Sequence, residues 1–271
     1  MEELKEEEEK DGEAVKLEWE GENLDCTALF KDILSYVLFT HHQIPQPLPQ
    51  LECSAFENIV VEHTTDTSAS LSERREQNRK TRAAKKEVKS RAKLMASIQA
   101  LLAALQGALK ELLDMPSVLL VLGPSTKQPF AVYDIQFYRI RAAFPSQDMQ
   151  GLSRSSNLEI LTRGLAKKIT RALVSQDSGP LFTGPMKLFL FIKADAMSCT
   201  PQDFVPKRGY VARFRKKQGY LRVIRIIGTS SSVNQGDVDP LLMDESKFGC
   251  NDMIWFQCKL NIKGGQCHDI L

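Results

Sequence analysis

The sequence predicts an α+β fold that combines three helices with one antiparallel sheet. Apolar residues recur every three or four positions in three segments, 25–40, 72–114 and 156–174, as amphipathic helices require. Apolar or alternating runs at 117–123 and 130–140 have the composition of β-strands. The chain has 271 residues, of which 42% are apolar, and this is enough for a sizeable hydrophobic core.

The helix predicted at 156–174 has two different faces. Ser156 lies three residues before Glu159, the spacing of a capping box, which predicts that the helix begins at Ser156. The inner stripe consists of Leu158, Leu161, Leu165, Ile169, Ala172 and Leu173. The outer face consists of Ile160, Arg163, Lys167, Thr170, Arg171 and Val174. Because this outer face is cationic and also carries apolar residues, it is either a solvated surface or a docking surface for another protein.

Two blocks of opposite charge lie outside the predicted core. Residues 1–25 contain twelve acids and three bases, and residues 73–93 contain ten bases and three acids. We therefore expect a disordered acidic tail at 1–24, followed by one domain at 25–271 in which 64–92 is a basic, partly flexible linker. The basic run at 74–93 could bind nucleic acid or act as a nuclear import signal. No aromatic residue is interleaved to stack on bases, and we interpret the run as a connector.

The remaining strands complete the predicted sheet. A turn at STKQ joins the strands at 117–123 and 130–140, and MKLFLFIKA is a further buried strand. The segment 205–228 alternates on both sides of KKQG, which predicts a long antiparallel hairpin with one basic side. That side is either a second nucleic-acid surface, within 207–225, or a charged edge that prevents aggregation. The last predicted strand is DMIWFQCKLNIKG.

The sequence contains none of the common motifs of enzyme active sites. It has no nucleophile elbow, phosphate-binding loop, zinc-protease motif or dinucleotide fingerprint, so we expect no catalytic residues and no cofactor. The six cysteines form no CxxC pair, and we expect free thiols and no metal site. The acidic start differs from a signal peptide, and no long uninterrupted apolar stretch predicts a membrane span.

Three segments resemble one known family. They are THHQIPQPLPQL at 40–51, DFVPKRGY at 203–210 and IWFQCKLNIKG at 254–264, and they resemble the comet-type proteins that bind the checkpoint protein Mad-two. The order of the basic linker, the leucine-rich helix, the LLVLG strand and the central helix also matches, so the resemblance covers about residues 25–265. It implies a HORMA-like fold, with three helices packed on one face of an antiparallel sheet and a C-terminal safety-belt segment.

The resemblance also implies a function. The chain would be a non-enzymatic adaptor that binds the closed conformer of Mad-two and presents it to an AAA+ remodelling ATPase. This would disassemble the mitotic checkpoint complex and silence the spindle assembly checkpoint, in the nucleus and cytoplasm and at the mitotic spindle. A nucleic-acid-binding module using 74–93 and 207–225, or a divergent HORMA-like adaptor for another partner, remains an alternative.

The family pattern places the partner-binding residues on two helices and one strand. The residues that would face Mad-two are Tyr36, Thr40, Arg163, Lys167, Thr170 and Arg171. Better-known members have glutamine at the position of Thr40 and phenylalanine at that of Thr170, so an aromatic anchor is missing here. Pro206 and Lys207 match the segment that engages the ATPase.

Overall fold

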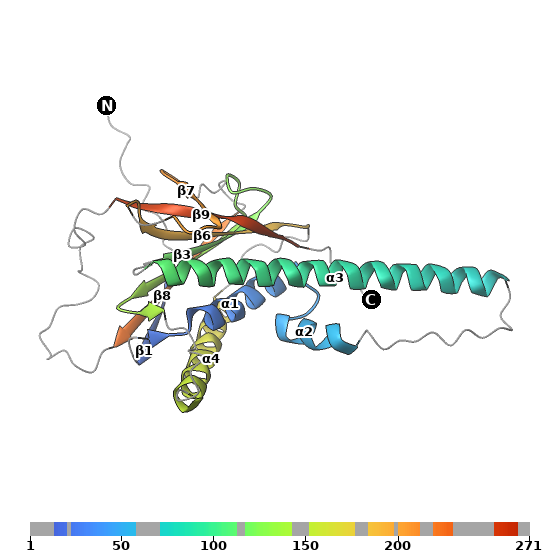
Figure 1. The fold of residues 1–271 in the computed structure, drawn as a ribbon, viewed down its shortest axis with the longest axis horizontal. Helices are drawn as coiled ribbons and strands as arrows, with labels where there is room; N and C mark the ends of the chain where they lie inside the picture. Colours follow the sequence, from blue (N-terminus) through green and yellow to red (C-terminus); the bar gives the residue numbers. More distant parts are fainter. Residues whose placement is uncertain are drawn as a thin grey trace, which may run out of the picture.

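A seven-stranded mixed sheet with helices on one face forms the body of the protein, as a computed structural model shows (Figure 1). The structure describes residues 14–20, 23–57, 71–112, 117–142, 152–176, 184–197, 200–211, 219–229 and 252–264. The strands follow the order β1-β8-β4-β3-β6-β9-β7 across the sheet. They are β1 (Val15–Glu20), β3 (Ser117–Gly123), β4 (Ala131–Tyr138), β6 (Lys187–Asp195), β7 (Phe204–Lys207), β8 (Tyr220–Thr229) and β9 (Met253–Lys263). The short strands β2 (Asn23–Leu24) and β5 (Arg141–Ala142) pair separately.

The centre of the sheet agrees with the sequence prediction. β3 is buried along its whole length, as its uninterrupted apolar sequence requires, and it pairs antiparallel with both β4 and β6. A turn closed by the Gln128 N–H bonding the Ser125 carbonyl, 3.2 Å away, connects β3 to β4. The α+β class and these strands are therefore confirmed.

The predicted antiparallel sheet and the hairpin at 205–228 are wrong. β8 runs parallel to β4 and to β1, so the sheet is mixed. β7 pairs with β9 at the opposite edge of the sheet, far from β8 in the strand order. Arg222 and Arg225 are three residues apart on β8 and therefore point to opposite faces, so these two do not share one basic side, and Arg213 and Arg215 lie outside the described residues. The predicted turn at 216–219 falls mostly outside the described residues.

Three long helices cover one face of this sheet, namely α1 (Cys26–Thr40), α3 (Leu71–Glu111) and α4 (Leu152–Ser175). One short helix, α2 (Leu48–Glu57), packs on α3. Asp25 caps α1 by accepting a 3.0 Å hydrogen bond from the Ala28 N–H. α3 packs on β9 and α1, whereas α4 packs on α1 and β1. The main core lies between these helices and the sheet.

A smaller apolar cluster lies on the sheet face that carries no described helix. It contains Leu119, Val121, Val132, Phe189 and Phe191. The chain that leaves β7 covers part of it, because the Tyr210 ring stacks on Phe191 with centroids 4.3 Å apart. This contact fixes the end of β7, where one predicted partner site lies.

The N-terminal segment does not match the prediction of a disordered tail at 1–24. Residues 15–20 form β1, in which Val15 and Trp19 are buried, and 23–24 form β2. The average composition is acidic, but VKLEWE alternates apolar and charged residues, and this pattern is typical of a strand. Residues 1–13 lie outside the described residues.

The proline run and the basic segment both contribute to helices. α2 begins within the proline run, with Pro49 at an early position where its missing N–H costs no helical hydrogen bond. α3 confirms the helix predicted at 72–114, and it makes the part of the predicted basic linker at 71–92 regular helix. Residues 64–70 lie outside the described residues.

The second half of α3 is apolar enough to resemble a membrane span. By length and composition the helix within Arg74–Glu111 reaches what a span needs, so the expectation that no such stretch exists does not hold there. In the structure Met95, Ile98, Leu101, Leu105 and Leu109 of this helix are buried in the main core. A core helix of a soluble protein has the same composition.

Candidate protein-binding surface

The outer face of α4 is exposed and partly apolar. Ile160 is 67% exposed and Val174 is 63% exposed, whereas Leu165, Ile169 and Leu173 are buried. The solvated or docking face predicted for this helix is therefore accessible. The helix begins at Leu152, so Ser156 lies inside it and the predicted capping box does not cap its N-terminus.

The buried stripe of α4 is rotated relative to the prediction. Leu161, predicted to be inside, is 52% exposed, and Thr162 is buried in its place. This rotation arises because α4 packs against α1 and β1, and not on the middle of the sheet. Leu161 consequently adds a third large apolar side chain to the accessible surface of the helix.

The cations of α4 differ in their partners. Arg163 forms a 2.9 Å ion pair with Glu159 one turn earlier. Burial raises the pKa of Asp32 on α1, and the positive charge of Arg163 offsets part of this increase. Lys167 and Arg171 are exposed and form no ion pair within the described part of the chain. Their charge is therefore available to an acidic partner.

Thr170 contributes little polarity to this face. It is half-buried, and its hydroxyl donates to the Ala166 carbonyl 2.9 Å away. Gly164 has no side chain and lies in the middle of the face, where a Cβ built on it would meet no atom within 4 Å, so the backbone is open to solvent there. A neighbour could therefore approach the α4 backbone closely between Ile160 and Lys167.

The end of α1 supplies the other predicted residues. Tyr36 and Thr40 are both half-buried, and their side chains share a hydrogen bond. Burial raises the pKa of Tyr36, and the hydrogen bond with Thr40 and the charge of Arg222 lower it in part. Phe39 lies between them in sequence and is 44% exposed, so it presents an aromatic ring to solvent.

His41 anchors this end of α1 to the sheet. Its Nε2 lies 3.0 Å from the hydroxyl of Tyr133 on β4 and 2.8 Å from that of Tyr220 on β8. Burial lowers the pKa of His41 to about 4, with a smaller effect from His42, so the ring is neutral. The sequence indicates helix-end packing or a charge that complements the helix dipole, and the neutral ring supports packing alone.

Gln43 forms a second anchor that the sequence pattern did not indicate. Its side-chain amide donates to the His41 and Gly184 carbonyls, at 2.7 and 3.1 Å. Its Oε1 accepts from the Met186 N–H at 2.7 Å. A glutamine that is 1% exposed yet fully paired holds the turn after α1 against the start of β6. These two anchors position Tyr36, Phe39 and Thr40.

Pro206 and Lys207 lie on a different side of the molecule. Both are exposed on β7, which pairs only with β9 and forms one edge of the sheet. The α4 face lies beside β1, which forms the other edge. The structure thus brings α1 and α4 together and separates them from the predicted ATPase site.

The described residues offer no metal-binding cluster. No group of three histidine, cysteine, aspartate or glutamate side chains in the described ranges could hold a metal ion. Cys26, Cys53 and Cys258 are free, as predicted for them, while the other three cysteines fall outside the described ranges. Burial raises the pKa of Cys26 to about 12, so this thiol stays protonated.

Comparisons with known proteins add no relative. No protein-family model matches the chain, and no curated protein sequence matches it.

Proposed function

We propose that the protein is a non-enzymatic HORMA-like adaptor that binds the closed conformer of Mad-two and presents it to an AAA+ remodelling ATPase. The choice of partners rests on the three sequence segments that resemble comet-type proteins. The exposed outer face of α4 is the structural observation that supports a protein-docking role. The spindle checkpoint is the process in which this activity would act.

The composition of the α4 face suits a folded protein partner. Ile160 and Val174 expose apolar side chains on the outer face, and Lys167 and Arg171, which form no ion pair within the described residues, supply positive charge. Interfaces of this kind combine an apolar centre with charged groups that steer an acidic partner. A solvated helix back would need no large apolar residues, and two on the same outer face favour docking.

Phe39 would supply the aromatic anchor that Thr170 lacks. It is exposed at the end of α1, which packs against α4. Aromatic side chains carry much of the binding energy at protein interfaces. Phe39→Ala should therefore weaken the complex more than Thr170→Ala does, because the small, back-bonded Thr170 side chain offers little contact area.

The experiment compares two neighbouring lysines of α4. Lys167 lies on the outer face beside Ile160 and Arg171, whereas Lys168 is exposed about 100° further around the helix. Lys167→Glu should reduce capture of Mad-two locked in the closed state by at least about tenfold, since a charge reversal at an interface costs more than 1 kcal/mol. Lys168→Glu changes the net charge equally and should bind like the wild type.

The measurement is the dissociation constant for locked closed and locked open Mad-two, with melting temperature as a control for folding. The adaptor role is supported if the wild type and Lys168→Glu prefer the closed conformer and Lys167→Glu does not. Equal affinity for both conformers, or equal effects of the two reversals, would contradict it. If neither conformer of Mad-two binds, the proposal is wrong.

A further inference from the structure

The first half of α3 is a cationic helix that extends beyond the rest of the protein. Figure 1 shows it, in teal, reaching past the sheet and past α2. Within 74–92 every described side chain is exposed or half-exposed, and none is buried. A helical segment without a buried side chain is unusual in a folded domain, because tertiary packing supplies most helix stability.

The bases of this segment form one stripe. At about 100° per residue, Arg75, Arg82, Lys85, Lys86, Lys89 and Lys93 fall within an arc of about 100°. The stripe is about 27 Å long at 1.5 Å per residue. Within the described residues these six side chains take part in no ion pair. The positive charge of the stripe is therefore not neutralised by the protein itself.

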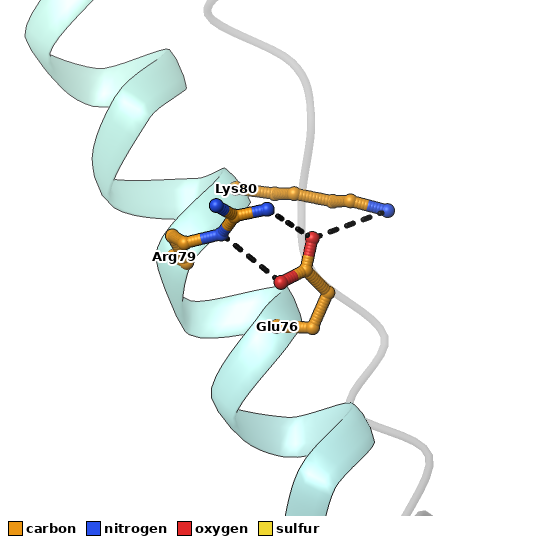
Figure 2. Close-up of polar contacts among 3 residues, drawn as sticks. All are labelled: Glu76, Arg79 and Lys80. Atoms are coloured by element: carbon orange, nitrogen blue, oxygen red, sulfur yellow. Dashed lines mark hydrogen bonds and ion pairs between the residues drawn. The ribbon is translucent and has the colours of Figure 1, made fainter.

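The acids of the segment lie on the other side of the helix. Glu76 contacts Arg79 at 2.8 Å and Lys80 at 4.0 Å, as Figure 2 shows. Glu87 contacts Arg91 at 2.9 Å. These pairs stabilise the helix by a few tenths of a kcal/mol each. They neutralise basic side chains that lie outside the stripe. The sorting of charges leaves a stripe with no carboxylate in it.

The chemistry of the stripe narrows the class of partner. Val88 is the large apolar side chain exposed in this segment, and it lies outside the stripe, so the helix has no apolar face for a membrane or a coiled coil. No aromatic residue is present to stack on unpaired bases, which disfavours single-stranded nucleic acid. Binding to a regular array of phosphates requires neither an apolar face nor aromatic residues.

We propose that the segment 74–93 of α3 binds in the major groove of duplex DNA through contacts to the phosphate backbone. An α-helix with its side chains is about 10–12 Å wide, and the major groove of B-form DNA is about 12 Å wide. Lys85 and Lys86 lie at the two margins of the stripe and reach toward opposite walls of the groove. The major groove of A-form RNA is too narrow for a helix.

This activity does not depend on the adaptor role. The stripe belongs to the part of α3 outside the core, whereas the α4 face and β7 lie on the body of the protein. The inference also explains why an interpretation of this segment as a plain connector is incomplete. A connector needs neither a continuous helix nor charges sorted to one side.

The test uses the full chain and fluorescence anisotropy with a labelled duplex of about 20 base pairs. The test variant is Arg82→Gln/Lys85→Gln/Lys89→Gln, in which glutamine preserves helix propensity. The control variant is Lys168→Gln/Lys187→Gln/Lys263→Gln, which removes three exposed charges elsewhere on the molecule. Duplex RNA and single-stranded DNA of the same length are measured in parallel, and circular dichroism confirms folding.

The wild type and the control should bind duplex DNA with a strong salt dependence between about 50 and 200 mM. The test variant should bind at least about tenfold more weakly, with its log–log salt slope reduced by about 2 to 3. Equal losses in both variants, or no binding of the wild type, would overturn the proposal. RNA or single strands bound as tightly as duplex DNA would overturn the groove assignment, and capture of acidic protein alone would indicate a protein site.

Discussion

His41 shows how one buried side chain couples the end of α1 to the sheet. Its Nε2 lies 3.0 Å from the Tyr133 hydroxyl and 2.8 Å from the Tyr220 hydroxyl, and these two hydroxyls lie 3.1 Å from each other, so the three groups form one hydrogen-bonded cluster. Nδ1 is buried and has no hydrogen-bond partner in the part of the chain that the structure describes. Protonation would place a charge in this apolar position, and burial opposes it.

The stability of the protein should therefore depend on pH through His41. The pKa is about 4 in the folded state, below the usual value near 6.5, so only the unfolded chain takes up this proton between those values. The free energy of unfolding should fall as the pH drops through this window, by up to about 1.4 kcal/mol per pH unit. Urea denaturation between about pH 7 and 5 measures this slope.

Two substitutions identify the source of that slope. His41→Gln removes the titrating group and should flatten this part of the pH profile. His42→Gln should retain most of it, because burial is the larger cause of the lowered pKa and the His42 charge the smaller one. Identical profiles for the wild type and His41→Gln would contradict the assignment.

Two glycines should respond to alanine with opposite signs. Gly164 is exposed within α4 and its added Cβ would meet nothing, so Gly164→Ala should raise the free energy of unfolding by up to about 1 kcal/mol. A Cβ on Gly264 would collide with Gln43, whose three hydrogen bonds hold the turn after α1. Gly264→Ala should therefore destabilise the protein, by about 1–3 kcal/mol. Chemical denaturation compares the two variants, and equal signs would be inconsistent with these surroundings.

At the scale of elements, α3 has two halves of different stability. Residues 95–109 are packed in the core, whereas 74–92 have no buried side chain and form local ion pairs such as Glu87–Arg91. Amide hydrogen exchange should be slow in the first of these ranges and fast in the second. Glu76→Gln/Glu87→Gln should accelerate exchange in 74–92 and leave 95–109 unchanged. Uniform protection along α3 would show that the exposed half has a further source of stability.

The sequence predicts which segments are strands better than it predicts how they pair. β3, β4 and β6 follow directly from their apolar runs. The alternation in β7 and β8 is equally visible, but a period of two does not identify the neighbour of a strand, and the nearby KKQG suggested a local turn. The parallel pairing of β8 with β4 and β1 joins segments that are far apart in the chain.

The candidate docking face was predictable because it depends on one local period. The exposed side chains of Ile160, Arg163, Lys167 and Arg171 follow from the helical repeat of α4. The buried Thr162 and the exposed Leu161 do not, since they depend on the direction from which α1 and β1 approach. The anchors at His41 and Gln43 were also beyond sequence reasoning, because their partners lie on β4, β8 and the start of β6.

At the scale of the whole molecule, the two proposed partner surfaces lie at opposite edges of the sheet. β1, which supports α4, and β7, which carries Pro206 and Lys207, are the two end strands of the order. Six interstrand spacings separate them, or about 29 Å. Pro206 also withholds an N–H from the β7 edge, which disfavours sheet extension there and leaves side-chain contacts available.

This separation predicts that the two surfaces act independently. Lys167→Glu should weaken capture of closed Mad-two and leave ATPase binding unchanged, and Lys207→Glu should do the reverse, since sites farther apart than about 10 Å rarely couple. In the double variant the two losses of binding free energy should add within about 0.5 kcal/mol. Binary affinities for each partner, and assembly of the ternary complex, measure these effects. If Lys207→Glu weakened Mad-two capture as much as Lys167→Glu does, both partners would share one surface, and an adaptor that holds them on opposite edges would be excluded.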